Sequence, residues 1–194
     1  YSALNLAGFI SDQFLDTFET NGTLLHGHPN RNLRWGIEFS AGSLGLGISF
    51  AVGVAKSCLL RGYQNRVFVI LGDGECNEGI VWESLAFASH HNLYNLTVIL
   101  DRNKLQLDAP TCEICNMEPF EEKFKAFNFH VEIVDGHNPV ALYSELKKRY
   151  DRPNVIIADT IKGKGVSFLE NNPACHHYVL KEKYIQGGAL WMTP

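Results

Sequence analysis

Several features that would assign this sequence to a common class of protein are missing from it. No apolar run approaches the roughly eighteen residues of a membrane-spanning helix. No cluster of lysine and arginine marks a nucleic-acid surface, and the formal net charge is −4. The start at Tyr1 has neither a methionine nor a charged leader before an apolar block, so we expect no secretory signal, and the missing methionine suggests part of a longer polypeptide. Neither a membrane nor a nucleic acid is therefore expected as a partner.

The cysteines do not form the pattern of a disulfide scaffold. There are five of them, an odd number with irregular spacing, which is typical of free thiols in a cytoplasmic protein. Cys112 and Cys115 form a lone CxxC pair without the second pair that a zinc site needs. A redox role would place such a pair at a helix start after a strand. We interpret both residues as incidental thiols in a loop, and we expect a cytoplasmic protein.

The composition is that of a globular domain. The chain has 194 residues, 45% of them apolar and 20% charged, which is enough for one domain over residues 1–194 with a sizeable core. Helical periodicity predicts helices at 2–20, 42–60, 79–93, 120–127 and 139–150, and apolar runs predict strands at 66–71, 96–100, 130–134 and 154–160. Residues 21–40 lack periodicity and predict a long loop, and a further loop is expected from Asn103 to about Met117. This alternation predicts an α/β fold, with a mainly parallel sheet and helices on both faces.

Polar residues follow two of the predicted strands at the point where each strand ends. Asp73 lies in a Gly-Asp-Gly sequence after strand 66–71, and Asn103 follows strand 96–100. A strand-helix-strand unit of this length forms a right-handed crossover with parallel strands, so both carboxyl ends open on the rim where open α/β folds bind ligands. We expect a carboxylate and an amide to converge there on a hard cation that carries ligand phosphates.

A third segment is placed to meet the same ligand. Residues 42–45 (GSLG) open a predicted helix, whose free N–H groups and dipole favour anions. Asp73, Asn103, a backbone carbonyl and two phosphate oxygens would nearly complete the coordination shell of Mg²⁺. The alternative interpretation is that the sequences around Asp73 and Asn103 are ordinary turns, as in many α/β proteins.

Taken together, these motifs resemble those of the transketolase family. They occur in the same order as in the family, with similar spacing between them, from the first residue to about His177. The matching segments are 27–29 (GHP), 40–47 (SAGSLGLG), 72–79 (GDGECNEG), 100–103 (LDRN), 162–165 (KGKG) and 170–176 (ENNPACH). A lone GDG would be weak evidence, whereas the ordered set is specific. The resemblance implies the thiamine diphosphate-binding fold. It also implies thiamine diphosphate and Mg²⁺ as cofactors, with Ca²⁺ or Mn²⁺ able to replace the magnesium.

The resemblance further implies roles for residues at matching positions. The metal that holds the diphosphate would be bound by the side chains of Asp73 and Asn103 and the carbonyl of Leu105. The cofactor would be bound by Gly42, Ser43, Leu44, Asp73, Gly74, Asn103, Lys162 and His176. His28 and His176 would be the catalytic, substrate-facing residues, and Glu78 and Glu83 would face a partner subunit. The alternatives are a plain loop histidine at His28, a solvated turn at Lys162, and acids that stabilise a helix start at Glu78 and Glu83.

The matching family carries two parts that this sequence does not. One is a pyrimidine-binding domain with the glutamate that activates the cofactor, which comes from a partner chain. The other is an upstream segment with further substrate-facing histidines. The sequence is therefore predicted to be either a trimmed subunit of a split transketolase or an internal fragment of a longer enzyme, and the first is favoured. We expect a heterotetramer with a pyrimidine-domain subunit, and no turnover by this chain alone.

The implied reaction transfers a two-carbon ketol unit from a ketose or its phosphate to an aldose. One alternative is a subunit of the 1-deoxyxylulose-phosphate synthase or 2-oxo acid dehydrogenase type, which would use pyruvate or another 2-oxo acid. A second is a non-catalytic subunit that keeps the fold, since Tyr178 stands where transketolases commonly have lysine and the upstream histidines are absent. Cys175 also departs from the family, which usually has tryptophan there. A dinucleotide oxidoreductase is disfavoured because no GxGxxG follows a strand.

Overall fold

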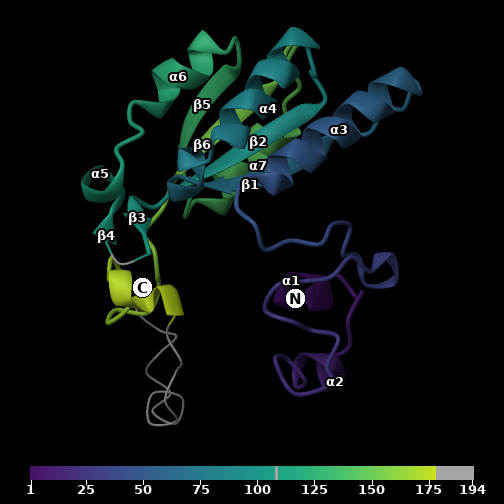
Figure 1. Ribbon diagram of the computed structural model, residues 1–194, viewed down its shortest axis with the longest axis vertical. Helices are drawn as coiled ribbons and strands as arrows, with labels where there is room; N and C mark the ends of the chain where they lie inside the picture. The colour runs from purple at the N-terminus through teal and green to yellow at the C-terminus, as the bar shows by residue number, and fades with distance from the viewer. Residues whose placement is uncertain (108, 178–194) are drawn as a thin grey trace.

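The computed structural model describes residues 1–107 and 109–177, and centres on a four-stranded parallel sheet (Figure 1). The strands are β1 (Val67–Gly72), β2 (Leu96–Arg102), β5 (His130–Asp135) and β6 (Asn154–Asp159), arranged in the order β1-β2-β6-β5. All three pairings are parallel, and the β1–β2 register aligns Gly72 with Asp101. The predicted α/β fold with a parallel sheet is confirmed, and the carboxyl ends of all four strands open on one rim.

In the part of the chain that the structure describes, four helices of at least seven residues accompany the sheet. They are α3 (Leu46–Leu60), α4 (Gly79–His90), α6 (Phe120–Ala126) and α7 (Pro139–Lys147). The step from β1 to β2 through α4 runs in one direction across the sheet, and the step from β5 to β6 through α7 runs in the other. Because both crossovers are right-handed, α4 and α7 lie on opposite faces. The prediction of helices on both faces is therefore confirmed.

The main core lies between the sheet and the α3–α4 layer. Leu71 on β1, Val98 on β2 and Val155 on β6 are fully buried against this layer, as are Ala55 on α3 and Leu85 on α4. The helices α3 and α4 pack directly against each other. On the opposite face of β1 the alternate side chains, those of Phe68 and Ile70, are 45% and 70% exposed.

The predicted helix over residues 2–20 is wrong. The structure has two short helices instead, α1 (Ser2–Leu6) and α2 (Asp12–Leu15), separated by Gly8 at a φ of 83°. A glycine in the left-handed region ends a helix at no steric cost, and Ser11 then starts α2 from an extended conformation. Residues 21–40 form the predicted long loop, which contains one 3₁₀ turn, η1 (Leu33–Trp35).

Two further boundaries differ from the prediction in ways that affect the site. The second helix begins at Leu46, because Gly45 takes a φ of 79° and ends the preceding turn, so residues 42–45 lie outside the helix. The segment after Asn103 is not a plain loop. It forms a small hairpin of β3 (Leu105–Gln106) and β4 (Ala109–Pro110), followed by α5 (Thr111–Ile114).

Cys112 therefore lies in the first turn of a short helix after a strand, and Cys115 ends that helix, so the loop expected for both is wrong. The four cysteines whose side chains the structure describes are all free. Over the described residues, no helix has the length and apolar character needed to cross a bilayer. The predictions for Tyr178 and for the Cys175 side chain lie outside what the structure describes.

Candidate cofactor and metal site

The centre of the candidate site is the carboxylate of Asp73, at the carboxyl end of β1. Its side chain is 3% exposed, and its two oxygens accept hydrogen bonds from backbone N–H groups of two different segments. Oδ1 accepts from the N–H of Gly74 at 2.8 Å, and Oδ2 accepts from the N–H of Lys104 at 2.6 Å. The N–H of Asp73 also donates to the carbonyl of Asp101 at 3.1 Å. Asp73 thus joins the ends of β1 and β2.

The charge on Asp73 is left uncompensated by the protein. Burial raises the pKa of its carboxyl above the usual range, and the nearby carboxylates of Asp101 and Glu118 act in the same direction, while its two N–H donors oppose the shift. No lysine or arginine of the described residues forms an ion pair with Asp73. A buried carboxylate without a cationic partner is costly, and a bound cation would remove that cost.

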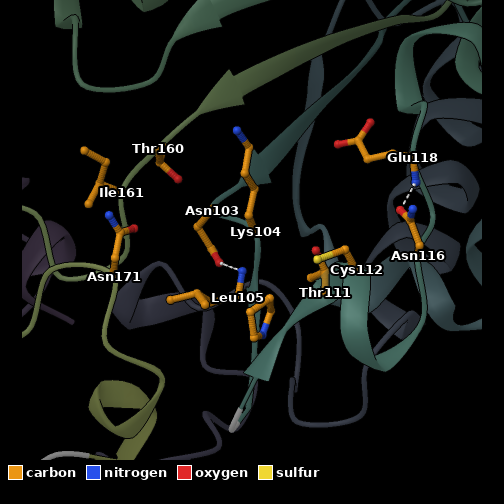
Figure 2. Close-up of a pocket in the computed structure, with 11 residues that line it drawn as sticks. Asn103, Lys104, Leu105, Thr111, Cys112, Asn116, Glu118, Thr160, Ile161 and Asn171 are labelled. Carbon is orange, nitrogen blue, oxygen red and sulfur yellow. Dashed lines mark hydrogen bonds between the residues drawn. The ribbon is translucent and has the colours of Figure 1, made fainter.

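Asn103 is held beside this carboxylate by its own network. Its Oδ1 accepts from the N–H of Leu105 at 3.0 Å, shown in Figure 2, and its Nδ2 donates to Oδ2 of Asp101 at 3.2 Å. Oδ1 of Asp101 in turn accepts from the hydroxyl of Thr160, after β6. These partners fix which end of the amide is oxygen, and an amide oxygen has a second lone pair for a ligand. The structure therefore places Asp73, Asn103 and Leu105 in one cluster, and their role as metal ligands stays a prediction.

The glycine-containing turn at residues 42–45 is joined to the same rim. The N–H of Gly45 donates to Oε1 of Glu75 at 2.7 Å, and Oε2 of Glu75 accepts from the N–H of Gly72, the last residue of β1, at 3.2 Å. Ser43 and Leu44 are exposed on this turn. The predicted neighbours of the cofactor on the turn and at Gly74 are thus brought to one edge of the sheet.

Close packing explains two of the glycines. A Cβ on Gly74 would lie 3.0 Å from the side chain of Gln106, and a Cβ on Gly42 would lie 3.0 Å from the ring of His28. His28 is exposed, and its ring lies against the 42–45 turn. These contacts bring His28 to the site, although it lies 14 residues before Gly42 in the sequence.

Lys162 and His176 form a separate pair. Nζ of Lys162 lies 3.0 Å from Nδ1 of His176, and the carbonyl of Lys162 accepts from the N–H of Asn171 at 3.0 Å. Both belong to the segment after β6, which also supplies one side of a pocket of about 610 Å³. Figure 2 shows this pocket, with Asn103, Lys104 and Leu105 on one side and Thr160, Ile161 and Asn171 on another. His176 itself is exposed and does not line it.

The two acids predicted to face a partner subunit lie on the surface. Glu78 precedes α4 as its N-terminal cap residue, Glu83 lies within α4, and both are exposed. Their exposure fits either a partner contact or a solvated helix surface.

Sequence reasoning missed the residues that hold the site together. Glu75 and Asp101 each bridge two segments, and Gln106 accepts from Nδ2 of Asn77 at 3.0 Å. The available signal for Glu75 and Asp101 was an acidic residue within two positions of a predicted ligand, but nothing in the sequence identified its hydrogen-bond partners. Oδ1 of Asn77 is buried without a partner, an unfilled acceptor close to Gly74 and Gln106.

The residues present fit a diphosphate held by a divalent cation. Asp73 supplies a buried carboxylate, Asn103 and Leu105 supply neutral oxygens, and the 42–45 turn leads into α3, the longest helix that the structure describes. No group of three or more histidine, cysteine, aspartate or glutamate side chains suited to a metal occurs in the described residues. A metal here therefore depends on amide, carbonyl and ligand oxygens as well as on Asp73.

Comparisons with known proteins all identify the same family. Residues 1–188 match the model of the transketolase thiamine diphosphate binding domain. The chain is 40% identical over 186 residues to a 6-deoxy-6-sulfo-D-fructose transketolase subunit of Clostridium sp., covering 94% of this chain and 68% of that protein. It is 37% identical over 183 residues to an apulose-4-phosphate transketolase subunit of Actinobacillus succinogenes, covering 93% and 66%.

Solved structures show the same fold. The crystal structure of the Campylobacter jejuni transketolase superposes with a TM-score of 0.84 at 28% identity, covering 90% of this chain and 29% of that one. The transketolase of Leishmania mexicana gives a TM-score of 0.77, also at 28% identity, over 90% and 28% of the two chains. The chain thus spans about two thirds of the related subunits and under a third of these whole enzymes.

Proposed function

The chain belongs to the transketolase family, and from this premise we propose that it is the diphosphate-binding subunit of a split transketolase. In this proposal it binds thiamine diphosphate through Mg²⁺, which Ca²⁺ or Mn²⁺ can replace, and it acts with a separate pyrimidine-domain subunit in a heterotetramer of two such pairs. The reaction is the transfer of a two-carbon ketol unit from a ketose, free or phosphorylated, to an aldose. The free thiols support a cytoplasmic location.

The observation that carries the proposal is the uncompensated, buried carboxylate of Asp73. It is held by the N–H of Lys104, the residue between Asn103 and Leu105, so the three proposed metal ligands belong to one hydrogen-bonded unit. A turn that only reverses the direction of the chain gains nothing from a buried charge, which is costly to remove from water. This argues against the alternative in which the sequences around Asp73 and Asn103 are ordinary turns.

Each part of the chain has its own task in this proposal. Asp73, Asn103 and the Leu105 carbonyl hold the metal, and the 42–45 turn with Gly74 receives the diphosphate. When bound, thiamine diphosphate would supply the carbanion chemistry of ketol transfer. His28 and His176 bind substrate hydroxyls and move protons, which an imidazole can do near neutral pH, and Lys162 holds His176 in place near the anionic cofactor.

The names of the related subunits support a sugar substrate. One relative is named for a sulfosugar and the other for a sugar phosphate, so both act on sugars that carry an anionic group. For this chain we propose the shared class, a ketose donor with an aldose acceptor. Substrates of the 2-oxo acid type are the competing class.

The test is reconstitution with a pyrimidine-domain subunit from one of the related split enzymes or from the same genome. The complete protein, its partner, thiamine diphosphate and Mg²⁺ are mixed, and ketol transfer between panels of ketoses and aldoses is followed by mass spectrometry. We expect transfer by the pair and none by either protein alone. Consumption of pyruvate in place of a ketose would contradict the proposed reaction, and a well-formed complex with no transfer would favour a non-catalytic subunit.

A further inference from the structure

Glu75 joins two parts of the candidate site that are far apart in the sequence. It lies in η2 (Gly74–Asn77), directly after the β1 strand end, and its side chain is half-buried. Oε1 accepts from the N–H of Gly45, 30 residues earlier, at 2.7 Å, while Oε2 accepts from the N–H of Gly72 at 3.2 Å. One carboxylate therefore fixes the 42–45 turn relative to the strand that carries Asp73.

The turn depends on this contact because it has no capping side chain of its own. Gly45 is the N-terminal cap of α3, and no side chain within the turn caps the helix. Its φ of 79° and the close approach of Ile80, which would lie 2.5 Å from a Cβ at this position, both require glycine. A glycine cap cannot supply an acceptor, so Glu75 provides one from another segment, and its charge is favourably placed at the start of a 15-residue helix.

We propose that Glu75 is a positioning residue for the cofactor diphosphate. It acts through Gly45, by holding the 42–45 turn at the distance from Asp73 that a metal-bound diphosphate requires. This inference rests on the proposed function and adds to it a residue outside the predicted set of ligands. Glu75 does not contact the diphosphate, because both of its oxygens are occupied by N–H groups and its charge has the same sign as a phosphate.

The sign of the effect separates positioning from simple electrostatics. If the charge of Glu75 acted directly on the diphosphate, its removal would tighten cofactor binding by reducing repulsion. If Glu75 positions the turn, removal weakens binding, because the cofactor must then order the turn as it binds. Hydrogen bonds to charged groups are among the stronger ones in proteins, so the expected loss of affinity is about tenfold or more.

The experiment uses the complete protein in complex with its pyrimidine-domain partner, and compares Glu75→Gln, Glu75→Ala and the control Glu122→Gln. Glu122 is exposed on α6, and its side chain forms no hydrogen bond or ion pair that the structure describes, so its variant repeats the charge change away from the site. Thiamine diphosphate affinity is measured by calorimetry at saturating Mg²⁺, and amide hydrogen exchange of residues 43–47 is measured without cofactor. Thermal unfolding is recorded for each variant.

We expect faster exchange in residues 43–47 and weaker cofactor binding in the order Glu75→Ala, then Glu75→Gln, with Glu122→Gln unchanged. Glutamine keeps one oxygen for the N–H of Gly45, so Glu75→Gln should retain part of the cofactor affinity. If Glu75→Ala does not fold, the cofactor affinity of Glu75→Gln alone tests the inference. Unchanged or tighter binding by both variants, with normal wild-type binding, overturns this inference alone. Wild-type protein that binds no thiamine diphosphate overturns the proposed function and this inference with it.

Discussion

Two groups of functional residues in this molecule are built in different ways. The cofactor group at the strand rim is interlinked and shielded from solvent: Asp73 is buried, Glu75 and Asp101 are half-buried, and each accepts hydrogen bonds from two donors. The proposed substrate group is exposed, since His28 rests against Gly42 and His176 pairs with Lys162 on separate loops. The difference indicates that this chain by itself fixes the side chains of the proposed metal and diphosphate site. The substrate side consists of surface residues that a partner could complete.

Among the substitutions that test this difference, replacing Asp73 should have the largest effect on cofactor affinity. Asp73→Ala removes the only buried carboxylate of the described residues and the acceptor of two N–H groups, so metal-dependent cofactor binding should fall by about a hundredfold or more. Calorimetry with thiamine diphosphate and Mg²⁺ measures the affinity, and Asp151→Ala, an exposed aspartate, is the control. Unchanged affinity would show that the metal assignment is wrong.

A smaller effect is expected from filling the space at Gly74. Gly74→Ala places a Cβ 3.0 Å from Gln106, so the β3 segment must shift and cofactor affinity should fall about tenfold. Gly79→Ala is the matched control, since a Cβ there meets nothing within 4 Å. Adding Gln106→Gly to Gly74→Ala should recover most of the affinity, because it also removes the Cβ of Gln106, which is one of the atoms 3.0 Å from the new methyl group. If the double variant is no better than the single one, the contact with Gln106 is not the cause.

His28 should affect the substrate and leave the cofactor alone. For His28→Ala in the assembled enzyme we expect kcat/KM for the ketose to fall about tenfold or more, since positioned acid–base groups contribute at least this much. Thiamine diphosphate affinity should change less than about twofold because the ring is exposed and only rests on Gly42. Steady-state kinetics and calorimetry test both, with exposed His26→Ala as the control. Loss of cofactor affinity at unchanged kcat/KM would show that His28 belongs to the cofactor group at the strand rim and not to the substrate group.

The ion pair between Arg102 and Asp159 predicts a modest pH dependence of stability. Its two hydrogen bonds, at 2.6 Å and 2.8 Å, hold the pKa of Asp159 below its usual range. A carboxyl with a lowered folded-state pKa stabilises the fold above its unfolded pKa of about 4, and this contribution is lost as the pH falls through the folded pKa. Because the Asp159 side chain is 43% exposed, the contribution is about 1 kcal/mol or less.

Urea unfolding of wild type and Asp159→Asn at a series of pH values measures this contribution. The difference between the two proteins should be largest near neutral pH and should shrink from about pH 4 downward. A difference that grows on acidification would contradict the direction of the pKa shift.

Cys112 should give the smallest effect, although its side chain lines the pocket beside Asn103. Under reducing conditions Cys112→Ala should change cofactor affinity and kcat/KM less than about twofold, because the thiol forms no hydrogen bond that the structure describes and is exposed. The same assays as for His28 test this. A large loss would show that the thiol has a role that the interpretation as an incidental residue misses.

Local sequence patterns predicted the parts of the fold in which apolar periodicity and burial agree. The four parallel strands and α4 fall close to their predicted bounds. Burial is nearly continuous in β2 and β6, alternates along β1, and follows one face of α4, whereas β5 has an apolar run without a fully buried residue. The helix over residues 2–20 failed because its apolar spacing was helical while Gly8 and the start of α2 at Ser11 were overlooked. Apolar spacing alone does not show where the backbone turns.

The candidate site, like the fold, could be predicted only where a general rule of the topology applies. The convergence of Asp73 and Asn103 at one rim could be predicted because parallel strands bring their carboxyl ends together, which is a property of the topology, and their role as metal ligands stays a prediction. Glu75 was not found, because its role depends on a contact with Gly45, and the position of that turn beside β1 is set by the packing of α3 on the sheet. The roles of His28, Lys162 and His176 came from the family resemblance, since nothing in their local sequence distinguishes them from loop residues.

The most direct test of the central claim is the position of the metal. Crystals of the complete protein with thiamine diphosphate and Mn²⁺ in place of Mg²⁺ would locate the ion by its anomalous scattering. The account predicts one strong peak at the carboxyl ends of β1 and β2, coordinated by Asp73, Asn103, the carbonyl of Leu105 and diphosphate oxygens. A diphosphate bound elsewhere, or a metal that Asp73 and Asn103 do not touch, would contradict it.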